Sequence, residues 1–258
     1  MRTRRDLPSL RQLRAFEAVA CCNSIGGGAK ELGLSQPAVT QMIFQLETAL
    51  AAKLLKRRRS GSFLTPFGDV LLTRVQRLFA QIQSALSDPA IGASLSGRET
   101  TKSVESKITD THIRTLTAIA ESGSFEAAGR RLNISQPTLH RSARDLERVL
   151  RRSLYQRMAR GLGPTSQARE LARRLKVALT EVEYGIEELR AAQGIFSSRI
   201  RIGNIPHSGT HLLSNAIRRF LGLYPSRSTP RSTSFAASRR TRPTRRTLRR
   251  RSQTRVAL

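Results

Sequence analysis

The chain has 258 residues, with 46 Lys and Arg against 18 Asp and Glu, and its formal net charge of +28 predicts a polyanionic partner. No apolar run approaches the ~18 residues of a membrane span, and the basic start leads into Asp6 and Pro8 and not into a signal-peptide apolar segment. The only cysteines, Cys21 and Cys22, are adjacent, which suits neither a disulfide framework nor a metal site with spaced ligands. We therefore expect a cytoplasmic protein without a membrane partner or a cofactor.

The sequence contains an ungapped internal repeat at an offset of 100 residues. Ser35-Gln36-Pro37 recurs as Ser135-Gln136-Pro137, and Leu46-Glu47 recurs as Leu146-Glu147. Between the copies, residues 88–107 are rich in Ser, Thr and Gly, which is typical of a polar linker without fixed packing. The repeat predicts two domains of one type, at residues 8–87 and 108–194.

Three short helices are predicted in each copy from the spacing of apolar residues. In the first copy the third helix follows Gly33-Leu34, which can form a tight turn, and it begins at Ser35, a favourable N-cap, with Pro37 in its first turn. The second copy repeats this order, with Asn133 in the turn and Ser135 as the cap. Helix, tight turn and helix together predict a helix-turn-helix in each domain.

An Arg-rich segment containing glycine follows each third helix. The segments are Lys56–Gly61 and Arg157–Gly163, and we interpret them as β-hairpin wings. Cations on such wings would lie against phosphates beside the groove that the third helix enters, which adds affinity but little sequence information.

These motifs resemble the N-terminal domain of the LysR-type bacterial regulators. The first copy has Leu13-Arg14-Ala15-Phe16, Ser35-Gln36-Pro37, Leu46-Glu47 and Leu64-Thr65-Pro66-Phe67-Gly68. Two departures stand out: Gly26-Gly27-Gly28 replaces helix-forming residues, at about 1 kcal/mol per Gly relative to Ala, and the wing end of the second copy is scrambled around Pro164. The resemblance implies a mainly α fold of two tandem winged helix-turn-helix domains.

In this family the wing is followed by a long linker helix that dimerises, and each copy has a candidate helix with seven-residue apolar spacing. This stripe predicts a helix partner and a homo-oligomer; the alternative is that it packs only on its own domain. The residues predicted to dimerise are Leu71, Val75, Leu78, Ile82, Leu171, Leu175, Val182 and Leu189.

The resemblance also implies that the third helix enters the major groove of double-stranded DNA. Gln36 is the predicted principal base reader, because a Gln amide can pair bidentately with adenine for roughly 1 to 3 kcal/mol of discrimination. The alternative is that the Ser-Gln pairs only cap helices and that the wing arginines form a solvated charge run. The predicted DNA contacts are Ser35, Gln36, Pro37, Thr40, Gln41, Phe44, Arg57, Arg58 and Arg59 in the first copy, and Ser135, Gln136, Pro137, Thr138, His140, Arg141, Arg144, Arg157 and Arg160 in the second.

The C-terminal part differs from both copies. Residues 195–225 resemble the first strand (199–203) and helix (211–223) of the family's α/β effector domain, which predicts a remnant too small to form a ligand pocket, so we expect no small-molecule effector. Residues 226–258 contain eleven Arg and no acid, which predicts a disordered basic tail. Because the composition changes abruptly after Pro225, we hypothesise a frameshifted or otherwise truncated product.

No motif indicates an enzyme. His207 and His211 have the i, i+4 spacing of metal ligands but lack further ligands nearby, and the glutamates between Glu181 and Glu188 are typical of a solvated helix face. The sequence therefore favours a cytoplasmic, nucleoid-associated transcriptional regulator that binds specific DNA as a dimer. Two alternatives stay open: a non-specific nucleic-acid-binding protein driven by the Arg-rich tail, and a decayed product whose linker helices capture an intact relative.

Overall fold

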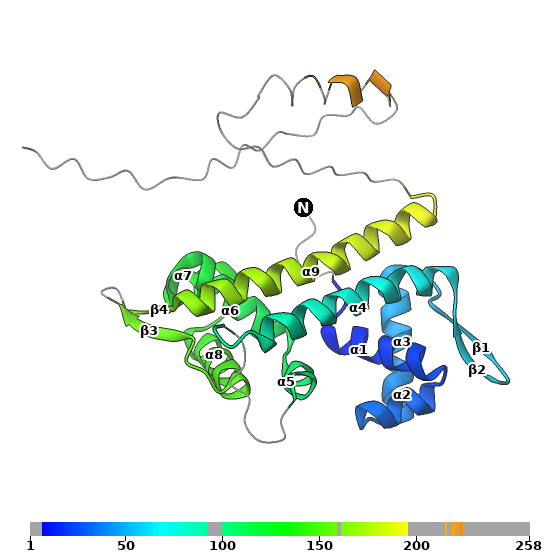
Figure 1. Cartoon of the computed structure of the whole chain (residues 1–258), viewed down its shortest axis with the longest axis horizontal. Helices are drawn as coiled ribbons and strands as arrows, with labels where there is room; N and C mark the ends of the chain where they lie inside the picture. Colours follow the sequence, from blue (N-terminus) through cyan, green and yellow to red (C-terminus); the bar gives the residue numbers. More distant parts are fainter. Residues whose placement is uncertain are drawn as a thin grey trace, which may run out of the picture. The chain divides into compact units, whose positions relative to one another are not determined.

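The computed structural model describes residues 7–91, 100–158 and 161–195, together with positions 215, 218–220 and 222–223. Its elements are mainly helices, as predicted (Figure 1). Residues 1–197 form one compact unit, and residues 198–258 are assigned to a second. The described positions of the second unit are helical and fall within the helix predicted at 211–223; the predicted strand at 199–203 and the basic tail lie outside the described residues.

Module 1 contains the three predicted helices and the predicted wing. They are α1 (Leu10–Cys22), α2 (Ile25–Leu32) and α3 (Gln36–Leu50), followed by the antiparallel hairpin of β1 (Leu55–Arg58) and β2 (Gly61–Leu64). Gly33, at a φ of 64°, ends α2, and the Ser35 hydroxyl accepts a hydrogen bond from the Ala38 N–H at the start of α3. The turn and the cap are those expected from the sequence.

Module 2 repeats this arrangement 100 residues later. It consists of α6 (Asp110–Ser122), α7 (Phe125–Leu132), α8 (Gln136–Leu150), β3 (Tyr155–Met158) and β4 (Gly161–Pro164). Asn133 takes the left-handed conformation of Gly33, with a φ of 54°, and Ser135 caps α8. The second wing is a paired hairpin despite its scrambled sequence, with Tyr155 opposite Pro164 and Met158 opposite Gly161.

A long helix follows each wing, and the two long helices lie side by side in Figure 1. They are α4 (Pro66–Ser87) and α9 (Ser166–Ala192), each capped by a threonine hydroxyl, that of Thr65 or Thr165. The whole apolar stripe predicted from the seven-residue spacing is buried: Leu71, Val75, Leu78, Ile82, Leu171, Leu175, Val182 and Leu189 are each at most 2% exposed. The helix that covers the stripe of α4 is thus α9 of the same chain.

The segment between the modules differs from the prediction. Residues 88–107 were expected to be a polar linker without fixed packing, but Thr101–Lys107 form a helix, α5, whose Val104 and Glu105 are buried. Val104 and the following Ile108 join the main hydrophobic core, and Glu105 is paired with Arg14 of α1. A polar composition did not prevent packing because two apolar residues and one paired carboxylate are enough to hold a short helix against its neighbours.

One hydrophobic core is shared by both modules. It contains the interior of module 1, the stripes of both long helices, and residues from α5, α6 and α8. A smaller cluster in module 2 consists of Ala118, Ile119, Phe125, Ala128, Leu139 and Ala143. The modules are therefore halves of one packed unit. No helix among the described residues is long and apolar enough to cross a membrane.

The three glycines of α2 do not prevent helix formation. Gly28 is buried against α1, where an added Cβ would lie 2.8 Å from the backbone nitrogen of Val19 and 2.8 Å from its Cγ2. A Cβ on Gly26 would meet nothing nearer than the Ser24 hydroxyl at 3.8 Å. The close approach of α1 and α2 thus explains Gly28 but gives no reason for Gly26.

Candidate nucleic-acid interface

One face of the first half of α3 is buried in module 1, and the opposite face is exposed. Val39 and Ile43 are buried, while Gln36 and Gln41 are exposed, Thr40 is half-buried, and 57% of Phe44 is exposed. Ser35 and Pro37, also exposed, complete the predicted set at the start of the helix. An exposed phenylalanine beside glutamine side chains suits contact with base edges and thymine methyl groups.

The first half of α8 presents more positive charge. Arg141 and Arg144 are exposed, as are Ser135, Gln136, Pro137 and Thr138, while Leu139 and Ala143 hold the helix in the core. The corresponding positions of α3 are Gln41 and Phe44, which carry no charge. The two helices therefore expose different chemistry on the same backbone framework, as the sequence predicts.

Two predicted readers of module 2 are engaged within the protein. The Nε2 of Gln136 donates to the Phe125 carbonyl oxygen at 3.5 Å. The ring of His140 stacks on the ring of Phe125, with centroids 4.5 Å apart and planes at 17°. This stacking depends on the aromatic residue at position 125, where module 1 has Ile25. Among the predicted DNA contacts on α8, Arg141 and Arg144 are both charged and exposed.

Tyr155, at the start of the second wing, completes this aromatic group with an edge-on contact to Phe125 at 4.9 Å between centroids. Burial raises the pKa of the Tyr155 hydroxyl, with a smaller contribution from the Glu147 carboxylate, so the side chain is neutral at physiological pH. Phe125, His140 and Tyr155 thus connect α7, α8 and the wing, and module 1 has Ile25, Thr40 and Leu55 in their place.

The first wing carries the predicted arginines on an anchored hairpin. Arg57, Arg58 and Arg59 are exposed, and the Arg58 guanidinium lies over the Phe63 ring, 5.7 Å from its centroid. The Ser62 N–H donates to the carbonyl oxygen of Asn23, in the turn after α1, at 2.8 Å. These contacts fix the wing beside the helix-turn-helix while leaving its cations accessible.

The second wing exposes Arg157, and Arg160 lies outside the described residues. Gly163 lets this wing approach module 2, because a Cβ there would lie 2.3 Å from the Met158 sulfur and 3.0 Å from the Gly123 carbonyl oxygen. The absence of a side chain at Gly163 therefore lets the second wing lie close to the turn after α6.

Glu47 and Glu147 connect each wing to its helix, a role that the sequence reasoning missed. One Glu47 oxygen accepts from the N–H groups of Leu54 and Leu55 at 2.9 and 3.2 Å. Glu147 does the same for Leu154 and Tyr155 at 2.7 and 3.2 Å. The recurrence of an acid in so basic a chain, at the same place in both copies, was the available signal.

The geometry of each module is that of a winged helix-turn-helix, a class that binds DNA with its second motif helix and its wing. A family model described as the bacterial regulatory helix-turn-helix protein of the lysR family matches residues 10–69 and 111–169, one segment in each module. The chain thus contains two copies of the lysR-family regulatory helix-turn-helix domain.

The chain is also similar to transcriptional regulators. The chain is 29% identical over 220 residues to the HTH-type transcriptional regulator GalR of Pseudomonas putida, a match that covers 85% of this chain and 53% of the relative. It is 37% identical over 82 residues to the HTH-type transcriptional regulator TdcA of Escherichia coli, covering 32% of this chain and 26% of the relative. The chain thus spans about half of the first relative and a quarter of the second.

Among solved structures, a hydrogen-peroxide-bound variant of OxyR from Corynebacterium glutamicum is 35% identical to this chain. The match covers 35% of this chain and 28% of that chain, with a TM-score of 0.32. Within the described residues, no cluster of three or more His, Cys, Asp or Glu side chains is arranged to hold a metal ion.

Proposed function

We propose that this protein is a transcriptional regulator that binds specific sequences of double-stranded DNA in the cytoplasm, associated with the nucleoid. The observation that carries the proposal is the pair of anchored helices, α3 and α8, which expose different polar side chains beside cationic wings. The two lysR-family helix-turn-helix matches and the regulator relatives support the same function.

Within this proposal the contacts have separate tasks. Gln36, Gln41 and Phe44 of α3 and Arg141 and Arg144 of α8 face base edges, whereas Arg57 to Arg59 and Arg157 on the wings face phosphates. An arginine can pair bidentately with guanine, and a glutamine with adenine, so the two modules prefer different base sequences. His140 acts as a positioning residue for α8 through its contact with Phe125.

The test is a binding selection from randomised duplexes, followed by titration of single-base variants of the selected site. Gln36→Ala is expected to reduce discrimination at one base position by about 5- to 150-fold, corresponding to roughly 1 to 3 kcal/mol, without changing the salt dependence. Arg57→Ala is expected to weaken binding to all sequences and to lower the salt slope by about one.

Gln45→Ala is the matched control, because Gln45 lies on α3 but is hydrogen-bonded to Gln12 of α1 at 3.2 Å. It should leave the base preference intact. Equal affinity of the unaltered protein for all duplexes would refute the proposal.

The alternative function, non-specific binding by the Arg-rich tail, has a separate test. Removal of residues 226–258 takes away eleven arginines and lowers overall affinity electrostatically. Under our proposal the shortened chain keeps its preference for the selected site. Loss of nearly all binding would instead assign the activity to the tail.

A further inference from the structure

The contacts between α4 and α9 follow an approximate two-fold relation inside one chain. Arg74 of α4 donates through Nε to Glu188 of α9 at 3.0 Å, and Arg174 of α9 pairs with Asp88, just after α4, at 3.1 Å. Residues 74 and 174 are equivalent in the repeat, and so are 88 and 188. The two long helices are therefore antiparallel, and each supplies the arginine of one ion pair and the acid of the other.

The midpoint of this relation is a contact between equivalent residues. Gln81 Nε2 donates to Glu181 Oε1 at 3.1 Å, and Glu181 also accepts from Arg74 at 2.9 Å. If α9 paired with α9 of a second copy in the same way, Glu181 would face Glu181 and two like charges would replace this hydrogen bond. The residues at the midpoint thus disfavour the pairing of α9 with a second α9.

The packing between the helices is close. A Cβ on Gly185 would lie 3.2 Å from the Cβ of Arg74 and 3.4 Å from a methyl carbon of Leu71. Gly185 is buried, as is Ala85 at the equivalent position of α4. Small residues on both helices therefore bring the two stripes together and bury them against each other.

Both ends of the helix pair contact the opposite module. Gln193, after α9, donates to the carbonyl oxygen of Ala51, in the turn between α3 and the first wing, at 3.0 Å. Arg152, in the equivalent turn of module 2, donates to the carbonyl oxygens of Pro89 and Ala90, after α4, at 2.8 and 3.0 Å. The helix pair thus links the turns that precede the two wings, and Figure 1 shows the wings at opposite ends of the pair.

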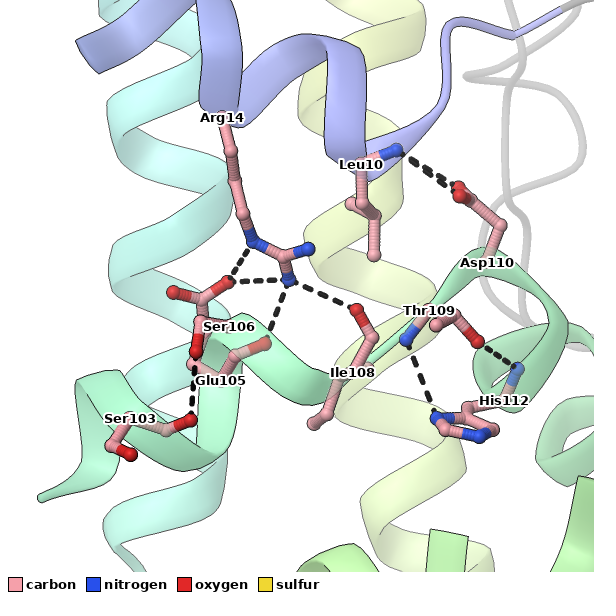
Figure 2. A network of polar contacts seen from close by, with 9 residues as sticks. All are labelled: Leu10, Arg14, Ser103, Glu105, Ser106, Ile108, Thr109, Asp110 and His112. Carbon is pink, nitrogen blue, oxygen red and sulfur yellow. Dashed lines mark hydrogen bonds and ion pairs between the residues drawn. The ribbon is translucent and has the colours of Figure 1, made fainter. Parts of the chain in front are cut away.

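Further bonds from the start of α1 reach α5 and the first residue of α6 (Figure 2). The Leu10 N–H donates to the Asp110 carboxylate at 3.1 Å, and Arg14 donates to Glu105 and to the Ile108 carbonyl oxygen. Glu105 and Arg14 have side chains only 5% and 14% exposed. These groups have given up water for each other, so each one requires the other as its partner while α1 is packed on α5.

We infer that the pairing surface used for dimerisation in the family is occupied here within one chain, so that a single chain displays two unlike DNA-reading helices and recognises an asymmetric site. The DNA part of this inference rests on the proposed function. Tethering supports it as well, since two surfaces on one chain meet at an effective concentration of up to about millimolar, well above that of a free second copy. A second copy is not required for either reading helix to be presented.

The first test is the mass of the full chain at micromolar concentration, measured by sedimentation equilibrium with and without a duplex that carries the selected site. One chain of 28.7 kDa is expected alone, and one chain per duplex in the complex. The selected site should consist of two halves with different sequences. A two-chain particle with a palindromic site would overturn the inference.

The second test separates pairing within a chain from exchange between chains. Arg74→Glu places a third carboxylate beside Glu181 and Glu188, and it is expected to lower the melting temperature. Adding Glu181→Arg and Glu188→Arg in the same chain should restore it. Mixing the Arg74→Glu chain with a chain carrying only the two Glu→Arg changes should not, even after joint refolding, and recovery in that mixture would contradict the inference.

Arg173→Glu is the matched control, because Arg173 is exposed on α9 and pairs with Glu170 of the same helix at 2.6 Å. It should have little effect on the melting temperature. The mass of the chain alone and the mixing test are measured without DNA. A chain that is monomeric but binds no specific duplex would therefore refute the proposed function and still support the pairing of α4 with α9 within the chain.

Discussion

The buried ion pair of Arg14 and Glu105 is the most direct probe of how module 1 is joined to α5, the helix that leads into module 2. Arg14 makes four hydrogen bonds: two to one Glu105 carboxylate oxygen at 2.9 and 2.7 Å, one to the Glu105 carbonyl at 2.7 Å, and one to the Ile108 carbonyl at 3.0 Å. Arg14→Met keeps an unbranched apolar side chain but leaves a carboxylate and two carbonyl groups without this partner. Removing one member of a buried pair costs about 3 to 5 kcal/mol, which is the expected loss in the free energy of unfolding.

The assay is denaturant unfolding of Arg14→Met, Glu105→Leu and the double variant. The double variant should lose less than Arg14→Met alone, because an apolar pair leaves no buried charge. Arg130→Met is the surface control: its partner Glu126 is 77% exposed, and such pairs contribute less than about 1 kcal/mol. A loss below about 1 kcal/mol for Arg14→Met as well would refute the reasoning that this contact is a desolvated junction.

Two further predictions concern α2 and the long helices. Gly26→Ala should stabilise the protein by up to about 1 kcal/mol through helix propensity, because there is space for the added Cβ. Gly28→Ala should destabilise the protein by about 1 to 3 kcal/mol, because the added Cβ would clash with Val19. Thermal unfolding of the two variants measures both effects. The hydrogen bond from Arg74 lowers the pKa of the Glu188 carboxyl group. The pair therefore stabilises the fold at pH values above the ordinary glutamate pKa of about 4.3. This stabilisation is lost as the pH falls through the lowered pKa of Glu188. The stability difference between the unaltered protein and Glu188→Gln should therefore shrink on acidification from about pH 6 to below pH 4; a constant difference would contradict the assignment.

Much of the fold could be predicted from local signals. Ser35 and Ser135 cap their helices because a short side-chain oxygen can accept from an N–H in the first turn, and this requires no distant residue. Gly33 and Asn133 end the preceding helices for an equally local reason, their tolerance of positive φ. The offset of 100 residues then extended each conclusion from one module to the other.

The side-chain environment of the reading helices was harder to predict. His140 and Gln136 lie at helix positions that face outward by period, yet both contact Phe125, which is on another helix. Glu47 was noted only as a repeated residue, because its task is to accept from the N–H groups of Leu54 and Leu55 several residues later. Contacts across elements depend on how the elements pack, and helix periodicity carries no information on that.

The long helices show most clearly which features the sequence determined and which features depended on the tertiary structure. The sequence by itself determined that Leu71, Leu78, Leu171 and Leu175 form apolar stripes that must be covered, because the hydrophobic effect requires burial and the seven-residue spacing aligns them. Only the tertiary structure decided that each stripe is covered by the other within one chain. The hydrophobic effect is non-directional, so the choice between partners rests on Gly185, on the Gln81–Glu181 contact and on the ion pairs around them, which meet only when the two modules are packed together.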